Sequence, residues 1–216
     1  MSKNLRKRIL TSLVLLFLLF CMLINNYILC YLLIVIGLIS IFEFFKMISI
    51  IFKNQDIKQF LINTTFSIYI FSFCSLFFLT ALVFESKIII SILLLTCVFS
   101  DIGGFTFGKI FKGAKLTKIS PNKTISGSVG SFIFSISFLY AAIYYLTGNI
   151  DMGSIIIGLA TSVGAQVGDL FFSLLKRKSF LKDTGNFLPG HGGFLDRIDS
   201  MLIGIPFGLI TLTMVH

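Results

Sequence analysis

Long apolar runs separated by short polar segments form the dominant pattern along this chain. An α-helix needs about 20 apolar residues to cross a bilayer, and most of the runs approach that length. We count seven of them, at about 9–24, 27–45, 60–84, 88–105, 129–147, 154–175 and 201–215. The pattern predicts an all-α fold, a polytopic integral membrane helix bundle with about seven transmembrane helices.

Three of these runs allow more than one interpretation. The run 9–24 resembles a signal peptide, but no small-residue cleavage site follows it, and the first alanine of the chain is Ala81. Because Asn25 and Asn26 break the run and another apolar stretch follows at once, we expect a retained helical hairpin there. The run 60–84 is long enough for one tilted helix or two short ones, whereas 201–215 is short for a span.

The composition agrees with a lipid environment. Hydrophobic residues make up 56% of the 216 residues and charged residues 12%, whereas soluble domains have about 45–50% and about 25%. This excludes an ordinary water-soluble enzyme, a disordered tail and a small disulfide scaffold. Because no polar linker is long enough to divide the chain, we expect one continuous structural unit, with N-terminal helices in 1–94 and the candidate chemistry in 95–216.

The basic residues predict the orientation. The chain has 18 Lys and Arg against 9 Asp and Glu. With a cytoplasmic N-terminus, 17 of the 18 basic residues fall on the cytoplasmic side, as the positive-inside rule requires. They lie in 1–8, 46–58, 106–128 and 176–200. Nucleic acid is not an expected partner, because no basic stripe with interleaved aromatic residues lies outside the lipid-length segments.

Five of the nine acidic residues lie at or just beyond the predicted cytoplasmic helix ends. An ionisable group within a membrane segment is costly unless it is paired or hydrated, so it indicates a functional site. The alternative is a structural ion pair with a nearby lysine. These five residues are Asp101, Asp169, Asp183, Asp196 and Asp199.

The other four acids carry less information. Asp56, Glu85 and Asp151 lie in short predicted loops and are expected to be solvated. Glu43 ends the second predicted helix. It is either an interfacial charge near Lys46 or a buried structural acid, and the sequence does not separate the two.

The acids favour a hard cation. If Asp196 and Asp199 open the last helix, their three-residue spacing places both carboxylates on one face. Carboxylates without neighbouring thiol or imidazole groups suit magnesium. Zinc is not expected, since the only histidines are His191 and the terminal His216.

Groups that handle phosphate surround these acids. The loop from Gly103 to Gly127 is rich in lysines and hydroxyls and leads into the next helix, whose N-terminus can bind an anion. A second basic segment, 176–182, precedes the glycine-rich stretch 189–193. Each feature alone is typical of a positive-inside loop. Together with the acids they indicate metal-assisted phosphoryl or nucleotidyl transfer on a lipid at the cytoplasmic face.

One motif is specific. The 27 residues from Ser173 to Asp199, which include Lys-Arg, Lys-Asp, Pro-Gly-His-Gly-Gly and Asp-Arg-Ile-Asp, closely resemble the signature of phosphatidate cytidylyltransferases, the CDP-diacylglycerol synthases. The segment from Asp101 resembles the family's Asp-Thr-Gly-Ala-Tyr, and 120–127 its Ser-Pro-Gly-Lys-Thr-Trp-Glu-Gly. The chain departs from the family in a shorter N-terminal half and in Ile102, Asn122, Ile125 and Ser126.

The resemblance implies a nucleotidyltransferase of the EC 2.7.7 class in phospholipid biosynthesis. It would convert CTP and phosphatidate to CDP-diacylglycerol and pyrophosphate, with Mg²⁺ as cofactor and a second cation left open. Phosphatidate is a phosphate monoester with a second pKa of about 6, like phosphoserine, so it needs no strong general base. The expected location is the cell inner (plasma) membrane, as a multi-pass protein in contact with membrane lipid, and a homodimer is left open.

The resemblance also implies roles for individual residues. Metal ligation falls to Asp169 and Asp196, supported by Asp101 and Asp199. The other catalytic candidates are Lys176, Arg177, His191 and Arg197. The substrate-binding candidates are Ser120, Lys123, Thr124, Ser173, Lys182, Gly192 and Gly193.

Three other classes of protein compete with this interpretation. CDP-alcohol phosphotransferases carry an Asp-Gly-x-x-Ala-Arg motif, which this chain lacks. A transporter or channel would place acids near the bilayer midplane, whereas here they gather at one side. An inactive relative acting as a scaffold stays open because of Ile125, Ser126 and the shortened chain.

Overall fold

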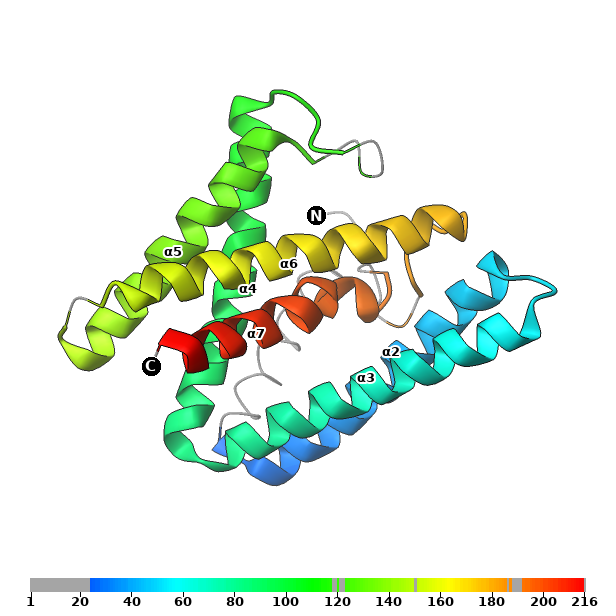
Figure 1. Ribbon diagram of the computed structural model, residues 1–216, viewed down its shortest axis with the longest axis horizontal. Coiled ribbons are helices and arrows are strands. Elements are labelled where there is room, and N and C mark those ends of the chain that lie inside the picture. The colour runs from blue at the N-terminus through cyan, green and yellow to red at the C-terminus, as the bar shows by residue number, and fades with distance from the viewer. Residues whose placement is uncertain are drawn as a thin grey trace, which may run out of the picture. The chain divides into compact units, whose positions relative to one another are not determined.

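The computed structural model describes residues 24–117, 120, 123–149, 151–185, 187 and 192–215. Within these residues the fold is all-α, with six helices and no strand, and an isolated β-bridge joins Lys115 and Thr124 (Figure 1). The helices are α2 (Asn26–Ile51), α3 (Asp56–Leu82), α4 (Phe84–Phe111), α5 (Ile125–Thr147), α6 (Gly153–Lys178) and α7 (Leu195–Val215). Each is long and apolar enough to cross a membrane.

These helices confirm the predicted fold class and six of the seven predicted segments. Residues 9–23 of the predicted helix at 9–24 lie outside the described residues, so the total of seven stays a prediction, as do the cytoplasmic N-terminus and the division at residue 94. The run 60–84 is one helix, because α3 continues unbroken to Leu82. Helix α7 begins at Leu195, six residues before the predicted start, and continues through Pro206.

Local side-chain bonds account for several helix ends. The Asn25 side chain accepts a hydrogen bond from the Tyr27 amide at 2.8 Å and caps α2. Thr124 caps α5 in the same way, accepting from the Gly127 amide at 3.1 Å. Gly148, with φ of +69°, ends α5 in the left-handed conformation that glycine adopts without strain.

The described residues form two compact units. The first comprises the residues up to Lys87 and Leu175–Ile198, and therefore includes α2 and α3. These helices lie side by side (Figure 1). The Phe44 and Phe66 rings stack with centroids 3.7 Å apart, which packs one helix against the other.

The second unit comprises Ile88–Leu174 and the described residues from Asp199 onward. Its apolar core includes the buried side chains of Leu93, Leu139 and Ile157. Helices α4 and α5 approach so closely that a Cβ atom added at Gly103 would collide with the backbone of Gly130. The glycines are thus required for backbone contact between these helices.

Candidate active site

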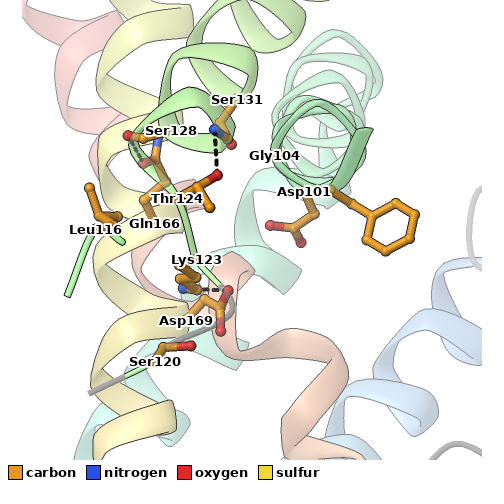
Figure 2. A pocket seen from close by; sticks show the side chains of 12 residues that line it. Asp101, Gly104, Leu116, Ser120, Lys123, Thr124, Ser128, Ser131, Gln166 and Asp169 are labelled. Carbon is orange, nitrogen blue, oxygen red and sulfur yellow. Dashed lines mark hydrogen bonds and ion pairs between the residues drawn. The ribbon is translucent and has the colours of Figure 1, made fainter. Parts of the chain in front are cut away.

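A cavity of about 360 Å³ lies in the second unit (Figure 2). Its wall is built from α4, α5, α6 and the loop that precedes α5. Asp101, Lys123 and Asp169, all predicted site residues, line this wall together with Ser120. The volume is at the lower end of the range for small-molecule sites, about 300–1,000 Å³.

An ion pair between the loop and α6 marks this cavity. The Lys123 ammonium lies 2.6 Å from the Asp169 carboxylate, and the side chains are 23% and 34% exposed. The other Asp169 oxygen accepts a hydrogen bond from Ser173, one turn later on α6, at 3.2 Å. Because the pair remains accessible, the ammonium can meet a phosphate oxygen without a large rearrangement.

Asp101 faces the same cavity from α4. Its carboxylate accepts a hydrogen bond from the Ser200 hydroxyl of α7 at 2.9 Å. Ser200 follows Asp199, which is 7% exposed and accepts from the Ser200 amide at 2.8 Å. Three of the four predicted metal-binding acids, Asp101, Asp169 and Asp199, therefore belong to the second unit.

Backbone pairing folds the preceding loop against the start of α5. The Leu116 amide donates to the Lys123 carbonyl at 2.8 Å, and the Ile125 amide donates to the Ala114 carbonyl at 3.0 Å. This pairing places Ser120 and Lys123 at the cavity wall. Thr124 also lines the cavity, although its hydroxyl already caps α5.

Sequence reasoning missed three polar residues of the cavity, Ser128, Ser131 and Gln166. The Ser128 hydroxyl donates to the Gln166 side-chain oxygen at 2.5 Å, and the Gln166 amide group donates to Ser162 at 3.3 Å. The signal was a carboxamide in an apolar helix, three residues before Asp169 in Gln-Val-Gly-Asp.

Asp196 is the centre of a second polar group, in the first unit. Its carboxylate lies 2.6 Å from the Lys176 ammonium, with the two side chains 9% and 16% exposed. Its other oxygen accepts from the amides of Thr184 at 2.8 Å and Gly193 at 3.2 Å. Asp196 thus joins the end of α6, the following loop and the start of α7.

The other predicted site residues of the first unit are placed around this group. Gly193 leaves no space for a Cβ atom beside Thr184, and Gly192 has a φ of +82°, so both positions favour glycine. Arg177, Lys182 and Arg197 are exposed. His191 lies outside the described residues.

The side chains at this cavity carry the type of ligand atom, oxygen, that magnesium prefers. Mg²⁺ usually takes one or two carboxylates together with substrate phosphates and water. Asp101 and Asp169 supply two carboxylates to one cavity, and Gln166 adds a carboxamide. Among the described residues, no group of three or more His, Cys, Asp or Glu side chains lies close enough to hold a metal ion by itself. The predicted ligand set stays a prediction.

The fold and this site define a polytopic helical membrane protein with acidic and basic side chains at a cavity. The model of the Cytidylyltransferase family matches residues 51–215, and the chain belongs to this family. The family resemblance expected from the sequence is thereby confirmed.

Named bacterial relatives match about half of the chain. The phosphatidate cytidylyltransferase of Helicobacter pylori (strain ATCC 700392 / 26695) is 42% identical over 113 residues, 52% of this chain and 42% of the relative. That of Bacillus subtilis (strain 168) is 44% identical over 112 residues, 50% of this chain and 41% of the relative. That of Rickettsia bellii (strain RML369-C) is 44% identical over 119 residues, 50% of this chain and 49% of the relative. The chain thus covers less than half of each relative's length.

Proposed function

We propose that this protein is a phosphatidate cytidylyltransferase, which converts CTP and phosphatidate to CDP-diacylglycerol and pyrophosphate. The observation that carries the proposal is the accessible Lys123–Asp169 pair at the wall of this cavity, in a chain of the Cytidylyltransferase family. The names of the relatives supply the substrates. Their bacterial origin and the six apolar helices support an inner-membrane, multi-pass location.

The reaction suits a site made of charges and hydroxyls. A phosphatidate oxygen forms a bond to the α-phosphorus of CTP, the bond from that phosphorus to the β-phosphate bridge oxygen breaks, and pyrophosphate leaves. The attacking oxygen is already ionised near neutral pH. Catalysis then depends on positioning the two phosphate groups and neutralising their charge.

The residues divide this work by their chemistry. Lys123 provides a positive charge at the cavity wall for a phosphate oxygen, and the hydroxyls of Ser120 and Ser173 provide hydrogen-bond partners. Lys176 is held by Asp196 and contributes a second ammonium. The remaining basic candidates for phosphate binding are Arg177, Lys182, His191 and Arg197.

Magnesium is part of the proposal. When bound, it would neutralise phosphate charge and be held by Asp169 and Asp196, with Asp101 and Asp199 in support. Lys123 and Lys176 are each paired with one of the two principal acids. These lysines would therefore turn toward substrate phosphate when a cation takes up the carboxylates.

The test is turnover by the full-length protein, purified in detergent micelles containing phosphatidate, with CTP labelled in the cytidine and Mg²⁺ present. We expect labelled CDP-diacylglycerol, together with an equal amount of unlabelled pyrophosphate. Omission of phosphatidate is the control for CTP hydrolysis. Tight CTP binding without product would instead favour the inactive-relative alternative, and absence of both binding and product would contradict the proposal.

A further inference from the structure

A buried carboxylate on α2 contacts the loop and helix that carry Asp196. Glu43 is 2% exposed. One of its oxygens accepts a hydrogen bond from the Phe194 amide at 2.9 Å. The other accepts from the Leu195 amide at 2.8 Å and from the Thr184 hydroxyl at 2.7 Å. All of these residues belong to the first unit.

These bonds explain how a carboxylate is accommodated there. Burying a charge is costly unless hydrogen bonds replace its hydration. The donors are neutral, but two of them are the backbone amides of Phe194 and Leu195 at the N-terminus of α7, where the helix dipole favours a negative charge. Glu43 therefore caps α7 from another helix. Of the two interpretations that the sequence left open, the buried one is confirmed.

The Thr184 hydroxyl links Glu43 to Asp196. It lies 2.7 Å from a Glu43 oxygen and 3.1 Å from an Asp196 oxygen, so two carboxylates compete for one hydroxyl proton. The Thr184 amide is bonded to the same Asp196 oxygen. A shift of Glu43 therefore displaces Thr184 and, with it, a partner that orients Asp196.

Two glycines leave space for the Glu43 side chain. A Cβ atom at Gly185 or at Gly193 would collide with a Glu43 carboxylate oxygen. The loop backbone thus closes directly on the carboxylate from both sides. This fit explains why the position of Glu43 determines that of the loop.

We infer that Glu43 is a positioning residue for the reaction, which acts through Thr184 and the first turn of α7 to hold Asp196 and its partner Lys176. The inference rests on the proposed function, because it takes Asp196 to be part of the catalytic site. Glu43 lies before residue 51, where the match to the family model begins. Sequence comparison over the matched region therefore does not reveal this role.

The first test is Glu43→Gln, with Glu85→Gln as the matched control, because Glu85 is exposed in the first turn of α4. Glutamine keeps the shape of glutamate. Its N–H₂ group, however, would face either the Phe194 amide or the pair formed by the Leu195 amide and the Thr184 hydroxyl, all of which are donors. We expect kcat to fall about 10- to 100-fold, as is typical when a partner of a site ligand is lost. The KM for CTP should stay within about threefold, and Glu85→Gln should retain wild-type kcat.

The second test avoids changing a buried charge. Thr184→Val removes the shared hydroxyl at nearly constant volume, whereas Thr184→Ser keeps it. We expect Val to lower kcat and Ser to restore most of it. If Glu43 and Thr184 act through the same series of hydrogen bonds, the double variant Glu43→Gln/Thr184→Val should lower kcat by less than the product of the two single reductions. Full additivity, or wild-type kcat in folded Glu43→Gln, would overturn the inference.

A readout that needs no activity separates this inference from the proposed function. Amide hydrogen exchange of the purified protein should be slow at Phe194 and Leu195 and should rise at least tenfold in Glu43→Gln, but not in Glu85→Gln. Unchanged exchange at these amides would contradict the positioning role. A wild-type protein without CDP-diacylglycerol synthesis, but with the expected exchange pattern, would contradict only the proposed function.

Discussion

At the scale of single residues, the polar groups are arranged as acid–base pairs. Lys123 pairs with Asp169 and Lys176 pairs with Asp196, each at 2.6 Å. In both pairs the acid has further hydrogen-bond donors. The lysines are thus held near the acids by charge, and a phosphate ligand with a cation can exchange these partners without leaving an unpaired charge.

The two acids yield the first prediction. Asp169→Asn and Asp196→Asn should each lower turnover at least about 100-fold, because a neutral amide neither binds a cation as well nor fixes the lysine. Both proteins should still insert in the membrane. Measuring CDP-diacylglycerol formation checks this, with Asp56→Asn as control, since Asp56 is exposed at the start of α3. Near-normal turnover in either mutant would remove that acid from the site.

Removal of metal provides the second prediction. A chelator should abolish turnover, and excess Mg²⁺ should restore it fully. Without the cation, the site has too little positive charge to neutralise a triphosphate and a phosphate monoester together. Activity is measured before chelation, after it and after Mg²⁺ is added. Turnover that persists in the presence of chelator, with CTP that carries no bound metal, would exclude Mg²⁺ as the cofactor.

At the scale of helices, small residues decide how closely the elements pack. Gly103 of α4 and Gly130 of α5 bring two backbones into contact, and Gly168 of α6 does the same beside the Asp199 carbonyl of α7. The cavity acids Asp101 and Asp169 lie on α4 and α6, within a turn of these contacts. Close packing therefore helps to set where the cavity side chains point.

The third prediction concerns the α4–α5 contact. Gly103→Ala should destabilise the protein by about 1–3 kcal/mol, because the added methyl group meets the Gly130 backbone, which cannot move aside alone. Gly104→Ala is the control and should destabilise the protein less. Its methyl group meets the Ser131 hydroxyl, a side-chain end that can rotate away. Thermal unfolding in detergent measures both. Equal melting temperatures for the two variants would contradict this account.

At the scale of the whole molecule, the distribution of charge predicts topology. Seven helices with a cytoplasmic N-terminus place the basic segments that hold Lys123 and Lys176 on the cytoplasmic side, where CTP is available. The six described helices, α2 to α7, are consistent in number with this arrangement once the predicted helix at 9–24 is added.

The fourth prediction tests this topology. A reporter fused after His216 should be extracytoplasmic, and one inserted after Lys123 should be cytoplasmic. An enzyme that is active on only one side of the membrane, such as alkaline phosphatase, measures each position. The reverse pattern would exclude the seven-helix arrangement, whatever the outcome of the activity assays.

The sequence by itself determined the helices and the kind of chemistry. Lipid requires apolar segments of a set length with internally bonded backbones, so hydropathy alone located α2 to α7. The apolar run predicted for α7 starts only at residue 201, because Asp196, Arg197 and Asp199 make the first turn of the helix polar; their spacing nevertheless allowed them to open it. Acids and lysines at helix ends, with one specific motif, were sufficient to indicate the family.

Only the tertiary structure decided which of these residues meet. Glu43 and Leu195 are 152 positions apart, and no local pattern predicts the bond between them. Gln166 was overlooked because its partner Ser128 comes from another helix. Periodicity reports which face of a helix is apolar, but a contact between distant residues depends on how closely two backbones can pack, and that depends on the whole fold.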